Sequence, residues 1–204
     1  MTVPAPDDRT TAAPLDRTAV ASAAGVLARA LADDPGWTYV FTDPPTRVAR
    51  MTALLAIMLE RVYLGLDGSW HVPGAAAAIW APPGRHDLPV RAVVPALPRL
   101  AWLVGRGVPR GLRVVRAMGR GTPGEPHWYL AALGVDPAHQ GRGLGPRVIA
   151  PVLERCDATR TLAWLESTNP KNHTFYRRCG FEVADQVAIT GGGPTITFFA
   201  RRPR

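Results

Sequence analysis

The stretch WYLAALGVDPAHQGRGLG, residues 128–145, holds the strand and the glycine-rich loop on which the predicted fold depends. Its first eight residues, Trp128 to Val135, are apolar or glycine at every position, so both faces of this strand need cover. Such continuity is typical of a central strand packed between helices, whereas a strand at a surface alternates apolar with polar residues. We therefore expect these residues to lie in the middle of a sheet.

The residues after this strand predict a βαβ unit. Apolar spacing predicts a helix from Leu144 to Arg155, although Pro151 inside it removes one backbone hydrogen bond and should kink it. Leu162 to Glu166 then predicts a second strand, parallel to the first and joined to it by a right-handed crossover. Ligands commonly bind where parallel strands end. We therefore expect the loops 136–145 and 166–172 to lie side by side.

The first half of the chain predicts mainly helices. Apolar periodicity indicates helices over 16–33 and over Thr46–Leu64, with an aromatic-rich loop, Trp37–Phe41, between them. Residues 74–81, GAAAAIWA, predict a buried strand, and residues 88–120 predict short helices interrupted by prolines.

The C-terminal part predicts one short helix and two closing strands. Asn169 and Pro170 are typical of a helix start, as cap and first helical residue, and Gly180 is typical of a helix end. The runs Phe181–Ile189 and Thr195–Arg201 flank a glycine-rich turn and predict the strands.

Composition narrows the classes of protein. The chain has 204 residues and a formal net charge of +8, which is almost all arginine because Lys171 is the only lysine. This charge fits an anionic ligand such as a nucleotide-containing cofactor, and it equally fits the codon bias of a GC-rich genome. No basic run is interleaved with aromatic residues, so we expect no nucleic-acid partner.

The sequence also favours a cytoplasmic protein without a membrane partner. The apolar window 92–104 is too short to span a bilayer, and Pro95, Pro98 and Arg99 interrupt it. Two cysteines, Cys156 and Cys179, do not make a disulfide framework, and nothing resembles a secretory signal.

The loop Gln140–Gly145 is a candidate phosphate site. Glycines at alternate positions let backbone N–H groups turn towards one point, and the following helix start adds donors and a positive dipole. Arg142 adds a full charge. An ordinary glycine-rich turn into a helix would have the same pattern. A dinucleotide fingerprint does not fit because Pro146 stands where its third glycine is needed, and the Gly-Lys-Ser/Thr of a P-loop is absent.

Two motifs together carry a family resemblance. The run LGVDPAH, residues 133–139, followed by the glycine loop resembles the acyl-CoA-binding motif of the GNAT N-acetyltransferase superfamily. The run LESTNPKNHTFY, residues 165–176, closing with Cys-Gly-Phe at 179–181, resembles the downstream motif of that superfamily. With GAAAAIW and the run EPHWYL, residues 125–130, the layout is most similar to the puromycin N-acetyltransferase branch.

The resemblance implies an α/β (α+β) fold. Its central sheet would be mixed and mostly antiparallel, with one parallel βαβ crossover, and helices would flank it. We expect a flexible tail over 1–14 and a single acetyltransferase domain over 15–204. Within that domain, a helical insertion at about 86–122 would lie on the acceptor side, and the acyl-CoA-binding core would span about 127–181. A monomer and a homodimer are both compatible with this layout.

The resemblance also implies acetyl-CoA as acyl donor, without a metal. Backbone groups of the strand end would bind the pantetheine arm and polarise the acetyl carbonyl, and Gly134 suits a local strand distortion there. The glycine loop would hold the pyrophosphate. The cofactor-binding residues expected on this basis are Leu133, Gly134, Val135, Gln140, Gly141, Arg142, Gly143, Leu144, Gly145, Asn172 and Phe175.

Tyr176 and Glu166 are the candidate catalytic residues. Tyr176 lies four residues after Asn172 on one helical face and would protonate the departing thiolate, unless it is a core aromatic paired with Phe175. Glu166, at the end of its strand, would take the proton of the amine directly or through water, bind a cationic acceptor, or simply be solvated. We expect His173 to point away from the face of Asn172 and Tyr176.

The acceptor is the least constrained part of the prediction. A bulky small-molecule amine, such as an antibiotic or an aminonucleoside, would suit an aromatic pocket, and antibiotic resistance is then a natural role. Three alternatives stay open: a protein or peptide N-acetyltransferase, a non-catalytic acyl-CoA sensor, and a nucleic-acid-binding protein, the last on charge alone. The candidate acceptor walls, some of which must be core, are Trp37, Tyr39, Phe41, Trp80 and Trp128.

Overall fold

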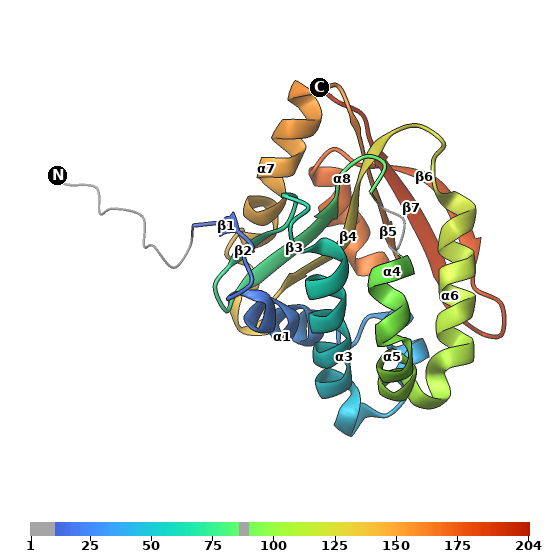
Figure 1. Cartoon of the computed structure of the whole chain (residues 1–204). Helices are drawn as coiled ribbons and strands as arrows, with labels where there is room; N and C mark the ends of the chain where they lie inside the picture. The colour runs from blue at the N-terminus through green and yellow to red at the C-terminus, as the bar shows by residue number, and fades with distance from the viewer. Residues whose placement is uncertain (1–10, 86–89) are drawn as a thin grey trace.

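The computed structural model of the protein describes residues 11–85 and 90–204 (Figure 1). Most of the tail expected over residues 1–14 lies outside this range. Its last two residues, Ala13–Pro14, form a short strand, β1, which pairs with β2. The sheet therefore begins inside the segment that was expected to be a tail.

The described residues form one seven-stranded sheet in the order β1-β2-β3-β4-β5-β7-β6. Every neighbouring pair is antiparallel except β4 and β5, which are parallel and joined through α7. This arrangement confirms the predicted mixed, mostly antiparallel sheet with one βαβ crossover. The longer strands are β2 (Trp70–Val72), β3 (Ala76–Ala81), β4 (His127–Val135), β5 (Leu162–Ser167), β6 (Glu182–Ala188) and β7 (Thr195–Arg201).

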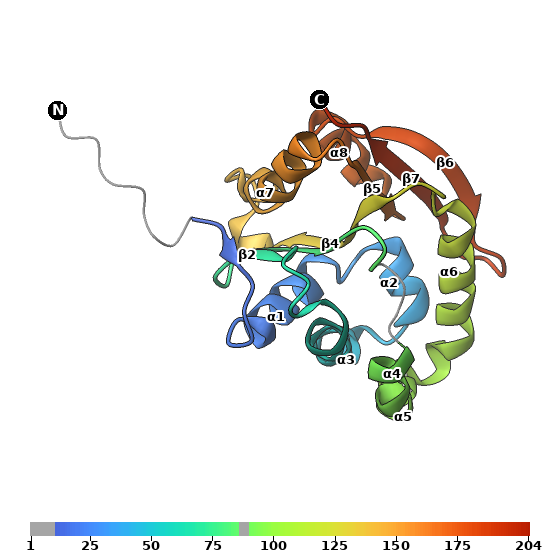
Figure 2. The same ribbon diagram turned by 45° about the horizontal axis from the view of Figure 1, so that its top comes forward.

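Helices cover both faces of the sheet (Figure 2). One face packs against α7 and α8, and the other packs against α1 and α3, with α6 over the β5–β7–β6 end. The α-helices are α1 (Val20–Ala30), α2 (Pro35–Val40), α3 (Pro44–Met58), α4 (Val90–Val93), α5 (Leu97–Val104), α6 (Val108–Gly121), α7 (Leu144–Ala158) and α8 (His173–Arg178). The shorter turns are η2 (Leu59–Tyr63), η3 (Val94–Ala96), η4 (Gly105–Gly107), η5 (Pro137–His139) and η6 (Pro170–Asn172).

The alternation of side chains along the strands divides the core into two layers. Trp128 and Leu130 of β4 lie with Val148 and Val152 of α7, whereas Ala131 packs on the α1 and α3 side. Both faces of β4 are thus covered, which explains why its sequence is apolar at successive positions. The expectation of a central strand is confirmed.

Two sequence expectations for the N-terminal half are wrong in detail. The aromatic segment expected as a loop is the helix α2, because Asp34 caps it by accepting a hydrogen bond from the Gly36 N–H at 2.9 Å and Pro35 occupies its first turn. The helix expected over Thr46–Leu64 begins at Pro44 as α3 and changes after Met58 into the π-helical turn η2. Such turns are often found at functional sites.

The pairing between strands β4 and β5 stops before either strand ends. Their parallel pairing runs from His127 opposite Leu162 to Leu130 opposite Leu165. Strand β4 nevertheless continues to Val135 while staying paired with β3. The edge of β4 that faces β5 is therefore unpaired beyond Leu130, and the two strands form a fork in the middle of the sheet.

A β-bulge lies at the base of this fork. The register between β3 and β4 shifts at Ile79 and Trp80, which face Ala132 and Leu130, so Ala131 is an extra residue on β4. The distortion expected at Gly134 is thus at Ala131. Glycine is needed at position 134 for a different reason. A Cβ there would lie 2.7 Å from the Cβ of Ala30, so only glycine lets α1 pack this close to the strand.

Candidate cofactor and active site

The glycine-rich loop opens towards solvent at the start of α7. Gly141 and Gly143 adopt positive φ angles of 77° and 70°, a region that favours glycine, and a Cβ on either would meet no atom within 4 Å. No side chain of the described residues caps α7 at Gly143, so the first N–H groups of this helix are available to a ligand. The geometry suits an anion bound by backbone donors.

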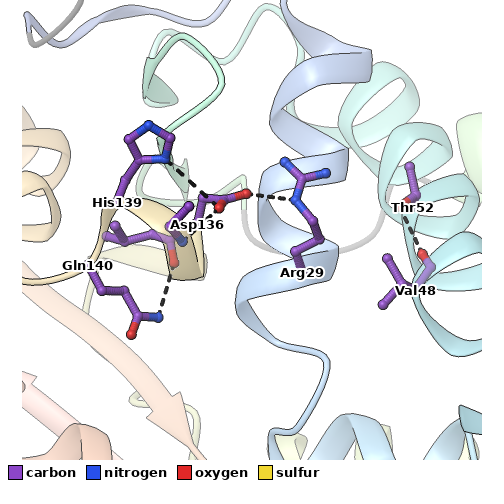
Figure 3. Close-up of polar contacts among 8 residues, drawn as sticks. Arg29, Val48, Thr52, Asp136, His139 and Gln140 are labelled. Carbon is purple, nitrogen blue, oxygen red and sulfur yellow. Dashed lines mark hydrogen bonds and ion pairs between the residues drawn. The ribbon is translucent and has the colours of Figure 1, made fainter.

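Asp136 fixes the base of this loop (Figure 3). Its Oδ1 accepts a hydrogen bond from the Ala138 N–H at 3.0 Å, and its Oδ2 lies 2.6 Å from Nε of Arg29 on α1. The hydrogen bond from Arg29 is the main reason why the pKa of Asp136 lies below its ordinary value. The side chain of Gln140 also acts within the loop, donating to the Val135 carbonyl at 3.3 Å. A charged pair thus ties the loop to α1.

Some of the remaining residues expected around the cofactor are buried, and others lie at the surface or in a turn. Leu144 is buried in the core, so only its backbone is available. Gly145 packs against Phe175, whose ring would lie 3.1 Å from a Cβ at that position, and this contact joins the two sequence motifs. Arg142 is exposed, and Asn172 ends the turn η6, which Asn169 caps through the Lys171 N–H at 3.1 Å.

Glu166 lies just beyond the point where β4 and β5 separate. The residue is half-buried, and its side chain accepts a hydrogen bond from the Tyr129 hydroxyl. Burial raises the pKa of Glu166 to about 7, although the hydrogen bond from Tyr129 acts in the opposite direction. The carboxyl group is therefore close to half-ionised at neutral pH, and it is not the solvated strand-end carboxylate that the sequence left open.

Tyr176 combines a core ring with a hydroxyl near Glu166. The ring packs against Phe175, Phe181 and Phe199, with centroid separations of 5.3, 6.2 and 5.4 Å. Burial raises the pKa of Tyr176, and the charges of Asp34 and Glu166 raise it further. The phenol thus stays protonated at neutral pH, and both interpretations of this residue, core aromatic and proton donor, are compatible with its position.

His173 does not point away from this face as expected. Its ring contacts Phe199 edge-on with a centroid separation of 5.1 Å, and Phe199 is the ring that Tyr176 also contacts. The two residues are three positions apart, which places them on one side of the helix. The expectation neglected this i, i+3 relation.

Three of the five aromatic residues expected to line the acceptor pocket are core residues. Trp80 and Trp128 pack under α7, on the sheet face opposite to Tyr129 and Glu166, and Phe41 is buried between α1 and α3. Trp37 and Tyr39 on α2 are half-buried. The Tyr39 hydroxyl donates to the Thr190 carbonyl at 3.1 Å. The candidate acceptor wall therefore reduces to α2.

Three residues around Glu166 and Tyr176 are not predicted from the sequence. Tyr129 could have been found, because it lies on the same sheet face as Glu166 once the parallel register is known. Tyr63 comes from η2, and the charge of Glu166 contributes to its raised pKa. Asp34 accepts a hydrogen bond from the Thr168 hydroxyl at 2.6 Å and so ties α2 to the loop after β5. No sequence signal places Tyr63 or Asp34 there.

The described parts of the chain contain neither a cluster of metal-binding side chains nor a membrane-spanning helix. Residues 11–85 and 90–204 contain no group of three or more histidine, cysteine or acidic side chains that could hold a metal ion. Across the same residues, no helix is both long and apolar enough to cross a membrane.

Comparisons with known proteins agree with this geometry. Residues 98–181 match the sequence model of the acetyltransferase (GNAT) family. The matched segment, residues 98–181, belongs to the GNAT acetyltransferase family. A stretch of 63 residues is also 32% identical to an uncharacterised N-acetyltransferase of Schizosaccharomyces pombe, a match that covers 31% of this chain. The chain spans about a quarter (26%) of the length of that relative.

Solved structures share the GNAT fold at low sequence identity. A Corynebacterium glutamicum protein described as histone acetyltransferase HPA2 and related acetyltransferase superposes with a TM-score of 0.72 and 21% identity, covering 95% of this chain and 96% of that one. The polyamine N-acetyltransferase of Drosophila melanogaster gives 0.64 and 16%, with 94% and 99% covered. Arylalkylamine N-acetyltransferase 2 of Aedes aegypti gives 0.62 and 11%, with 95% and 98% covered.

Replacing Gly143 with valine tests the role of the glycine loop. The branched side chain would occupy the open space in front of the α7 start, and we expect affinity for CoA to fall by about tenfold or more, measured by calorimetry. Gly84→Val is the matched control: Gly84 also has a positive φ angle and open space around its Cβ, but it follows β3 at the other end of the sheet. Equal CoA affinities in the two variants would contradict the loop assignment.

Proposed function

We propose that the protein is an acetyl-CoA-dependent N-acetyltransferase that acetylates the amine of a small molecule by direct attack in a ternary complex. The fork between β4 and β5 is the observation that supports this most strongly. A helix start without a side-chain cap lies at its open end, and a carboxyl group with a pKa near neutrality lies at its base. Groups suited to bind the acetyl donor and to take the proton of the amine thus lie within one region.

The chain offers groups that fit each part of acetyl-CoA. The unpaired edge of β4 would receive the amides of the pantetheine arm as an added strand does. The N–H groups at Gly143 and the following turn would hold the pyrophosphate. Acetyl-CoA supplies the acetyl group when bound, and no metal is needed for this chemistry.

Glu166 and Tyr176 would perform the two proton steps. Glu166, with a pKa of about 7, would take a proton from the amine nitrogen, directly or through water, as that nitrogen forms the new C–N bond. Tyr176, protonated at neutral pH, would donate its proton or a hydrogen bond to the sulfur as the C–S bond breaks. The products are the amide and the free thiol, so no covalent enzyme intermediate is required.

The charges around α2 favour an acceptor with at most one positive charge. The guanidinium of Arg110 lies 5.8 Å from the centre of the Tyr39 ring, and Nη1 of Arg113 lies 3.4 Å from the Tyr39 hydroxyl. These two cations would repel a polyamine, whereas one ammonium group could pair with Glu166. An aminonucleoside or another antibiotic amine would satisfy this limit, which makes antibiotic resistance a candidate role.

The layout of the chain supports the same proposal. Residues 15–204 would form one acetyltransferase domain, in which the helical segment at about 86–122 flanks the acceptor side. Helix α6 carries Arg110 and Arg113 from this segment to α2. We still expect the acceptor to be a small amine. We also expect the protein to be a monomer or a homodimer in the cytoplasm.

An acceptor screen tests the proposed function. Purified protein, acetyl-CoA and a panel of aminonucleosides, monoamines, polyamines and peptides would be monitored by thiol release. We expect turnover with small amines that carry at most one positive charge, and little with polyamines. Turnover confined to peptide N-termini or lysines would replace the small-molecule proposal with a protein acetyltransferase, and CoA binding without any turnover would indicate a sensor.

Tyr176→Phe tests the proton donor. Removal of the hydroxyl should leave the ring packing intact and lower kcat by about tenfold or more, with a much smaller change in KM for acetyl-CoA. The loss should shrink with a thioester whose leaving thiol is more acidic, because that thiolate needs less protonation. Steady-state kinetics on both thioesters give the comparison. Near-normal kcat would make Tyr176 a packing residue, and equal losses on both thioesters would indicate a positioning role.

A further inference from the structure

We propose that Tyr129 is a positioning residue for the catalytic base: its hydroxyl holds the carboxyl group of Glu166 at the fork and stabilises the ionised form. This inference rests on the proposed function, because it concerns the residue assigned there as the base. It adds a side chain of β4 to the proton-transfer groups proposed on β5 and α8.

The parallel register between β4 and β5 makes this contact possible. Tyr129 lies opposite Trp164, and Glu166 follows two residues later on the same face of the sheet. Pairing with β4 stops at Leu165, so Glu166 is the first residue of β5 beyond the fork. Tyr129 is the last residue of β4 before the fork on that face. Its long side chain spans the diagonal between the strands and hydrogen-bonds to Glu166 Oε1.

Other titratable groups surround Glu166 without taking this role. Tyr63 approaches from η2 and Tyr176 from α8, both close enough for the charge of Glu166 to raise their pKa values. The charge of Asp34 also raises the pKa of Tyr176. Within residues 11–85 and 90–204, Tyr129 is the residue whose side chain hydrogen-bonds to the Glu166 carboxyl group. The other two phenols are linked to Glu166 through the effect of its charge on their pKa values.

The hydrogen bond from Tyr129 shifts the pKa of Glu166 in a defined direction. Burial favours the neutral carboxylic acid and raises the pKa of Glu166, whereas a hydroxyl that donates to the carboxylate favours the charged form and lowers it. Without the Tyr129 hydroxyl, burial would be opposed only by the smaller effect of a backbone hydrogen bond at Glu166. The pKa of Glu166 would then rise, and less of the enzyme would carry an ionised base at neutral pH.

Tyr129→Phe and Tyr63→Phe form a matched pair that tests this role. Each variant loses one phenol hydroxyl near Glu166, but only the first loses a hydrogen bond to it. The carboxyl resonance of Glu166, assigned with Glu166→Gln, would be titrated by ¹³C NMR in each protein. We expect its midpoint to rise by about one pH unit in Tyr129→Phe and to change little in Tyr63→Phe.

Kinetics supply the second readout. The rise of kcat/KM for the amine with pH should shift upward with the NMR midpoint in Tyr129→Phe, so that the loss is several-fold at neutral pH and smaller at high pH. An unchanged NMR midpoint in Tyr129→Phe, or an equal change in Tyr63→Phe, would overturn the inference. Because the titration needs no turnover, it tests Tyr129 even if no amine is acetylated and the proposed function fails.

Discussion

The separation of β4 from β5 after Leu130 and Leu165 is the constraint on which the candidate site depends. A strand in the middle of a sheet normally pairs on both edges, because unpaired backbone groups away from water cost free energy. Here β3 continues to pair with β4 as far as Val135, while β5 turns away. A ligand that carries its own amides could pair with the free edge, which is why we propose that the cofactor binds at this interruption of the sheet.

Neighbouring features maintain and use this fork. The bulge at Ala131 lies at its base, and the glycine at position 134 lets α1 pack tightly behind the strand. Arg29 on the same helix then pairs with Asp136, which fixes the loop that leads to α7. On the other side of the fork, Glu166 accepts a hydrogen bond from Tyr129, and its charge adds to the effect of burial in raising the pKa values of Tyr63 and Tyr176. The end of the β4–β5 pairing thus determines where the loop and Glu166 lie, and the surroundings of Glu166 set its ionisation.

Local patterns in the sequence predicted the elements well and their faces less well. The apolar run of β4, the glycine loop and the Asn169 cap each report their own backbone conformation, so the βαβ unit was predictable from them. Trp80 and Trp128 were misplaced because the face that a strand residue occupies depends on register and on which helices cover the sheet. Segment Trp37–Phe41 was misassigned because Asp34 and Pro35, which suggest a stop after α1, also start α2. Tyr63 and Asp34 depend on tertiary contacts that no local pattern records.

Hydrogen exchange of the β4 amides is the measurement that bears most directly on the fork. Amides of residues 127–130 are already within the paired part of the sheet, whereas those of 131–135 that do not bond to β3 are free. Saturating CoA should slow exchange at these free amides, at Gly143 and in the first turn of α7, and leave residues 127–130 unchanged. Protection elsewhere in the chain, with no change at residues 131–135, would show that the fork is not where the ligand binds.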